Sequence, residues 1–178
     1  KPFDTALSKS SLLPKATKKE FTDHTDVCLY NTNCVEHNKA MLDAQKRISN
    51  LIKDCYAHVY YKMIDEHKEE YETFIESNRG TYAFVSLIGS LNEHLIQCNR
   101  LSQKSSTKEQ VDSMEPYFDV LIDYLCNMPI DDQTKIRLIK GQGADTLWLG
   151  MYQNAIHKQI PEYNPHGLEA WLEKQDKG

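Results

Sequence analysis

Two short segments of the sequence place a histidine and a cysteine four residues apart. They are His24-x-x-x-Cys28 and His94-x-x-x-Cys98. On a helix this spacing puts an imidazole and a thiol one turn apart on the same face. Four such ligands on two facing helices could hold a zinc ion, and either pair alone could activate its thiol for redox or nucleophilic chemistry. Structural zinc sites usually have closer ligand spacing, so we interpret the two pairs as a coincidence of composition rather than a metal or catalytic site.

The sequence lacks the motifs that encode the geometry of phosphate loops, dinucleotide sites, catalytic serines and zinc peptidases. A helical bundle could hold a di-iron centre, but its ligands need Glu-x-x-His, and no Glu or Asp here has a histidine three residues on. The segment Gly141-Gln142-Gly143 precedes a predicted helix, but Asp145 lies where an anion would bind, which favours a capping loop. We therefore expect a protein that is not an enzyme and has no cofactor, no metal and no catalytic residues.

The chain has five cysteines in 178 residues, which is many for a cytosolic helical domain. Cys28 and Cys34 flank the turn-prone triplet at 31–33 and are candidates for a disulfide. The alternative is that these cysteines are buried free thiols. Neither an initiator Met nor an apolar leader stands at Lys1, as in a mature chain after signal removal or a trimmed one. We expect a secreted or extracytoplasmic protein, with a cytoplasmic location as the alternative.

The charges exclude two classes of partner. The chain carries 21 Lys and Arg against 26 Asp and Glu, a formal net charge of −5. Because no positive field extends over such a chain, nucleic acid is not an expected partner. The longest apolar stretches, such as 82–88 and 120–125, fall far short of the roughly 20 residues that cross a bilayer. No membrane span is therefore predicted.

Tyrosines outnumber phenylalanines by ten to five. Tyr tolerates half-exposed positions and supplies contact area at low entropic cost. Tyr56, Tyr60 and Tyr61 cluster on one predicted helix and cannot all face one stripe, so at least one should be exposed to a partner. They are our candidate binding residues, with packing at the rim of the core as the alternative. The acidic run that follows, beginning at Asp65, is either a solvated face or a docking patch for a basic partner.

The spacing of apolar residues predicts an all-α fold, a helical bundle built on a long second helix. A capping box at 17–20 predicts a first helix to about Tyr30. A second box at 33–36 predicts a helix of about 45 residues that ends before Asn78 and either bends or elongates the bundle. The third helix, about Thr81 to Gln103, is apolar around more than half of its surface and should be central. Pro116, placed in a first turn, predicts a short helix leading into a longer one, about Met114 to Asn127.

We expect residues 1–16 to form a flexible arm and residues 17–178 to form a single all-α domain. Its main bundle spans 17–128, and a C-terminal helical cap spans 129–178. Glycines and prolines divide the cap into three shorter helices near 131–140, 145–158 and 165–174. Trp148 and Trp171 both lie in the cap.

The composition is typical of a non-enzymatic binding protein that acts through protein–protein contacts, as secreted effectors, inhibitors and immunity-type proteins do. One alternative is a carrier of a small hydrophobic ligand, with a pocket lined by the third and fourth helices and the Trp-bearing cap. A cytosolic adaptor or chaperone is another.

Overall fold

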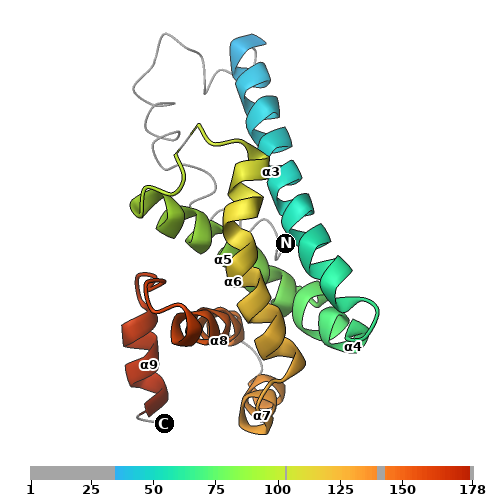
Figure 1. The fold of residues 1–178 in the computed structure, drawn as a ribbon, viewed down its shortest axis with the longest axis vertical. Helices are drawn as coiled ribbons and strands as arrows, with labels where there is room; N and C mark the ends of the chain where they lie inside the picture. Colours follow the sequence, from blue (N-terminus) through green and yellow to red (C-terminus); the bar gives the residue numbers. More distant parts are fainter. Residues whose placement is uncertain (1–34, 103, 140–142, 177–178) are drawn as a thin grey trace.

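A computed structural model describes residues 35–102, 104–139 and 143–176 of the chain (Figure 1). This part of the chain consists of helices and contains no strand, which confirms the all-α class. The predicted arm at 1–16 and the predicted first helix at 17–30 lie outside the described residues. The elements are α3 (Val35–Met63), α4 (Lys68–Tyr71), the π-helical turn η1 (Glu72–Glu76), α5 (Asn78–Gln97), α6 (Thr107–Cys126), α7 (Ile130–Leu138), α8 (Ala144–Gln159) and α9 (Leu168–Asp176).

Helix α5 is the buried centre, as the sequence predicts. It starts at Asn78 because the Ser77 hydroxyl accepts a hydrogen bond from the Gly80 amide at 3.1 Å. It ends at Gln97, six residues before the predicted end. Asn99 adopts a left-handed φ of 56°, and the Arg100 amide donates to the Leu95 carbonyl at 2.9 Å. This turn closes the helix in the way that a left-handed residue commonly does.

The long second helix predicted from the sequence is divided in the structure. Helix α3 ends at Met63, and a turn separates it from α4. Asp65 and Glu66 follow directly, where the negative end of the α3 dipole disfavours carboxylates. After the turn, α4 contacts α3 and η1 packs against α5, and these two short elements bury Tyr71 and Phe74. Tyr71 and Phe74 therefore pack against the core from a different direction than the residues of α3.

Helix α6 is one continuous helix from Thr107, which corrects the predicted short helix before Met114. Ser106 and Glu109 form a capping box at its start. Pro116 lies inside the helix rather than in a first turn. The carbonyl left without a partner belongs to the residue four positions earlier, the exposed Asp112, where water can satisfy it.

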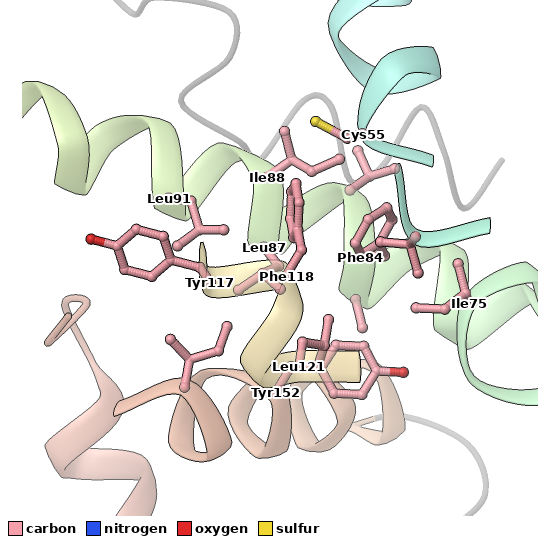
Figure 2. Packing of buried hydrophobic residues seen from close by; sticks show 14 of the residues in the cluster. Cys55, Ile75, Phe84, Leu87, Ile88, Leu91, Tyr117, Phe118, Leu121 and Tyr152 are labelled. Carbon is pink, nitrogen blue, oxygen red and sulfur yellow. The ribbon is translucent and has the colours of Figure 1, made fainter. Parts of the chain in front are cut away.

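The three helices of the cap agree with the prediction to within a few residues. Helix α8 packs mainly on α5, and α9 packs on α8. Trp171 of α9 lies against the backbone of Gly150, where a Cβ would overlap its indole ring. Side chains of α8 belong to the same buried cluster as those of α3, α5 and α6 (Figure 2).

One hydrogen bond joins the cap to the π-helical turn. The Tyr152 hydroxyl of α8 donates to the Phe74 carbonyl of η1 at 2.5 Å, and Tyr152 is fully buried. Burial raises the pKa of Tyr152 well above its usual value, so the hydroxyl stays protonated and keeps donating. Gly80 of α5 packs against the same carbonyl, where a Cβ would overlap it.

We predict that Tyr152→Phe destabilises the protein by about 1–3 kcal/mol, because the buried Phe74 carbonyl loses its side-chain donor. Urea unfolding followed by circular dichroism measures this change. Tyr61→Phe is the matched control, since Tyr61 is exposed and its hydroxyl is in water. Equal stability of the two variants would contradict a structural role for the Tyr152 hydroxyl.

Candidate functional site

The three candidate tyrosines lie near the C-terminal end of α3 and differ in exposure. Tyr61 is 76% exposed and Tyr60 is 39% exposed. Tyr56 is half-buried, and its ring meets Phe84 edge-on with the centroids 4.8 Å apart. Burial raises the pKa of Tyr56. The structure thus places Tyr56 at the rim of the core and the other two on the outside; we call Tyr60 and Tyr61 the tyrosine surface.

A third aromatic ring, that of the buried Tyr71, packs against the tyrosine surface from the interior of the protein. Tyr60 makes edge-on contacts with Tyr61 and with Tyr71, at centroid distances of 5.6 Å and 5.4 Å. Tyr71 is buried, and burial, together with the charge of Glu76, raises its pKa to about 12. Tyr71 was not predicted as a partner of Tyr60, because the sequence predicts one long helix that contains both residues. The acidic residues after Met63 were the available signal for a break.

Residues 65–76, which we call the acidic band, follow the tyrosine surface directly. The band has six carboxylates and one lysine, so its formal charge of −5 equals that of the whole chain. Lys68 pairs with Glu72 inside the band at 3.6 Å. The carboxylates are Asp65, Glu66, Glu69, Glu70, Glu72 and Glu76, and all but the half-buried Glu70 are exposed. The rest of the chain is therefore formally neutral.

A polar cluster joins α3 to α6 beside the tyrosine surface, through residues on both sides of it in the sequence. The His58 ring is mostly buried, with Nδ1 at 3.2 Å from Glu115 and Nε2 at 3.2 Å from Asp119. Lys62 Nζ also donates to Asp119, at 2.5 Å. Partial burial opposes ionisation of Asp119, but the hydrogen bonds from Lys62 and His58 outweigh it and lower the pKa of this carboxyl. This cluster holds the end of α3 that carries Tyr60 and Tyr61 against α6.

The His94–Cys98 pair predicted from the sequence does form a contact, with Cys98 Sγ at 3.8 Å from each ring nitrogen of His94. A sulfur equally far from both nitrogens aligns with neither of them. His94 is buried edge-on against Tyr117 and Tyr163, and burial together with the charge of Arg100 lowers its pKa. These contacts are typical of an imidazole that is packed in the core.

The other half of the possible zinc site, His24 and Cys28, lies outside the described residues. Within the part of the chain that the structure describes, no group of three or more His, Cys, Asp or Glu side chains could hold a metal ion. The candidate disulfide of Cys28 with Cys34 also lies outside. The described cysteines, Cys55, Cys98 and Cys126, are free thiols. Burial raises the pKa of the Cys55 thiol, which makes it unreactive.

A cavity of about 560 Å³ lies between α6 and the cap. Its lining comes from α6, α7, α8 and α9, and α5 contributes no lining residue. The pocket that a carrier would need was predicted between the third and fourth helices and the cap. The cavity observed here is therefore displaced from that position, towards the surface of the cap.

No protein-family model, curated protein or solved structure matches this chain. None of the helices described here is long and apolar enough to cross a membrane.

We predict that Asp119→Asn destabilises the protein at neutral pH, and that this destabilisation shrinks progressively as the pH falls below the usual Asp pKa of 3.8. Because the pKa of Asp119 is lowered on folding, its ionisation contributes stability above the usual Asp pKa of 3.8, and this is lost as the pH falls. Urea unfolding of both proteins across this pH range measures the difference.

Asp112→Asn is the control for this experiment, since the ion pair of Asp112 among the described residues is with the exposed Lys108 of its own helix, and such pairs contribute little. A destabilisation by Asp119→Asn that stays the same in acid would show that its charge is not the cause.

Proposed function

We propose that this chain is a non-enzymatic binding protein that contacts a basic segment of a partner protein through its tyrosine surface and acidic band. The observation that carries the proposal is the exposed Tyr60–Tyr61 pair beside the twelve residues that hold the entire net charge. Single exposed apolar residues are ordinary on a protein surface. Tyrosine, however, is enriched at interfaces and in their hot spots, and the rim of an interface is polar.

The arrangement of the rings supports a binding role. Tyr60 is held between Tyr61 and the buried Tyr71, so its ring is already immobilised before a partner arrives. Binding to a preorganised side chain costs less conformational entropy than binding to a free one. The His58 cluster on α3 holds the helix that carries both rings.

The charge of the band supports a basic partner. Carboxylates steer cations over distances of about 10 Å at moderate salt, and they repel acidic chains. Tyrosine faces attract guanidinium groups more readily than ammonium groups. A segment rich in arginine therefore matches both features better than one rich in lysine.

We further propose that the protein works outside the cytosol, as its cysteine content suggests. The proposal depends on Cys28 and Cys34, because the described cysteines are free. A cytosolic adaptor with the same tyrosine surface is the alternative, and the state of the thiols separates the two.

We predict that the protein binds a fluorescein-labelled arginine-rich peptide more tightly than a lysine-rich one, and does not bind a glutamate-rich one. Fluorescence anisotropy measures the three affinities. The double variant Tyr60→Ala/Tyr61→Ala should weaken arginine-peptide binding by roughly tenfold or more, as loss of a hot spot does. Glu69→Gln/Glu70→Gln should reduce both the affinity and its dependence on salt.

Leu138→Ala is the matched control, because Leu138 on α7 is 74% exposed and lies outside both features. Loss of binding in the Leu138 variant, or full binding in the tyrosine variant, would overturn the proposed surface. Circular dichroism of each variant shows whether the fold is retained.

For the location, we predict that the denatured native protein alkylates at Cys55, Cys98 and Cys126 without reductant, and also at Cys28 and Cys34 after reduction. Intact-mass spectrometry counts the labels. Alkylation of all five cysteines without reductant would place the protein in a reducing compartment and reject the extracytoplasmic proposal.

A further inference from the structure

Helix α7 carries an exposed apolar row that the proposed function does not use. Ile130 and Leu138 are 79% and 74% exposed, and among the large apolar side chains of the described residues only Tyr61 is comparably exposed. Thr134 lies between them at four-residue spacing, so the three side chains form one row along the helix. The Thr134 hydroxyl donates to the Ile130 carbonyl at 2.8 Å. Because this hydroxyl is already bonded to the backbone, Thr134 interrupts the apolar row little.

The opposite side of α7 is fastened to the rest of the molecule. Ile136 is buried, and its position in the helix is on the side opposite the row. Asp132 accepts a hydrogen bond from the Tyr124 hydroxyl of α6 at 2.9 Å. Just after the helix, the Ile139 carbonyl accepts a hydrogen bond from Arg79 of α5 at 2.8 Å. The row therefore lies on the outer face of a helix that is held in place.

The charges of α7 are ordered along the helix. Asp131 and Asp132 lie in its first turn, and Lys135 and Arg137 lie in its last turn. The helix is formally neutral, so it does not repel a second α7, whereas two acidic bands repel one another. In an antiparallel pair, the acidic first turn of each helix lies beside the basic last turn of the other, and the two helix dipoles are also opposed. The order of the charges thus matches an inverted copy of the same helix.

We propose that α7 pairs with α7 of a second copy of this chain, antiparallel and about a two-fold axis beside Thr134. Ile130 and Leu138 are each four positions from Thr134, in opposite directions, so this axis places Ile130 beside Leu138 of the other copy. Asp131 and Lys135 lie on one flank of the row, and an antiparallel two-fold places this flank against the same flank of the other copy. Asp131 of each copy then pairs with Lys135 of the other.

The size of the helix limits the strength of the pairing. Helix α7 has nine residues, so a pair of them buries less than the roughly 1,200–2,000 Å² of a standard interface. The dimer is therefore weak and depends on the protein concentration. The row shares no residue with the tyrosine surface or the acidic band, so either proposal can fail without the other.

Sedimentation velocity of the full chain over a wide range of concentrations tests the pairing. We expect the average mass to rise with concentration from 20.6 kDa towards twice that value. Ile130→Ser and Leu138→Ser should each move this rise to a roughly tenfold higher concentration, because each removes an apolar contact that the dimer makes twice. Non-reducing gel electrophoresis of the same samples detects any dimer that is joined by a disulfide.

Tyr61→Ser is the matched control, since Tyr61 is as exposed as Leu138 but lies on α3. It should leave the rise in mass unchanged. Circular dichroism of each variant shows whether the fold is retained.

Two charge variants test the antiparallel arrangement. Asp131→Lys makes the charged flank of the row wholly basic, and Lys135→Asp makes it wholly acidic. Each variant alone should stay monomeric at concentrations at which the unchanged chain pairs, because like charges then face one another. An equimolar mixture of the two variants should pair again, because each basic flank then faces an acidic one. Apolar contact without this charge pairing would not restore association in the mixture.

Three results would overturn the proposal. The first is a mass that stays at the monomer value at every concentration, which would leave the row to a partner of another kind. The second is association that is lost in the Tyr61 variant and kept in the Leu138 variant, which would place the contact at the tyrosine surface. The third is a mixture of the two charge variants that stays monomeric although the unchanged chain pairs.

Discussion

The Phe74 carbonyl is the point at which three parts of the molecule meet. It belongs to the π-helical turn, it accepts the buried Tyr152 hydroxyl of α8, and it lies so close to Gly80 that no larger residue fits there. A π-helical turn shifts the backbone bonding by one residue, and such turns recur at functional sites. Here the turn is also the last part of the acidic band. The position of the band therefore depends on a hydrogen bond from the cap.

Helix α6 connects the tyrosine surface with the cavity. Glu115 and Asp119 face α3 and hold His58 and Lys62, which orient the tyrosine surface. One turn further along, Asp123 and Asn127 line the cavity under the cap. Asp112, Asp119, Asp123 and Asn127 recur along this helix as a narrow polar row. In the structure this row is divided. Asp119, in its middle, faces α3, whereas Asp123 and Asn127, at its end, line the cavity.

Much of the fold could be predicted from the sequence because it depends on local signals. Helix periodicity, the Ser106 capping box and the glycines and prolines of the cap act over a few residues, and the structure agrees with them. The break after Met63 depends on repulsion by a dipole and on packing of Tyr71, and the passage of α6 through Pro116 depends on solvent at Asp112. These effects depend on the positions of neighbouring helices, which the local sequence does not specify.

The candidate site could be predicted only in part, because local signals reveal some of its residues and not others. The excess of tyrosine and the acidic run are visible in composition, so Tyr60 and Tyr61 could be named. Tyr71 and the His58 cluster could not, because they join residues through the turn after Met63 and across α3 and α6. The cavity under the cap was beyond sequence reasoning as well, since its lining comes from four helices whose packing fixes it.

The acidic band and the cavity differ in their distribution of charge. All of the net charge lies in the acidic band, whereas the cavity has two carboxylates and two ammonium groups and is neutral as a whole. A concentrated charge acts at a distance and raises the rate of encounter with a basic partner. A neutral cavity has no such reach, so any selection there depends on shape and on direct contacts.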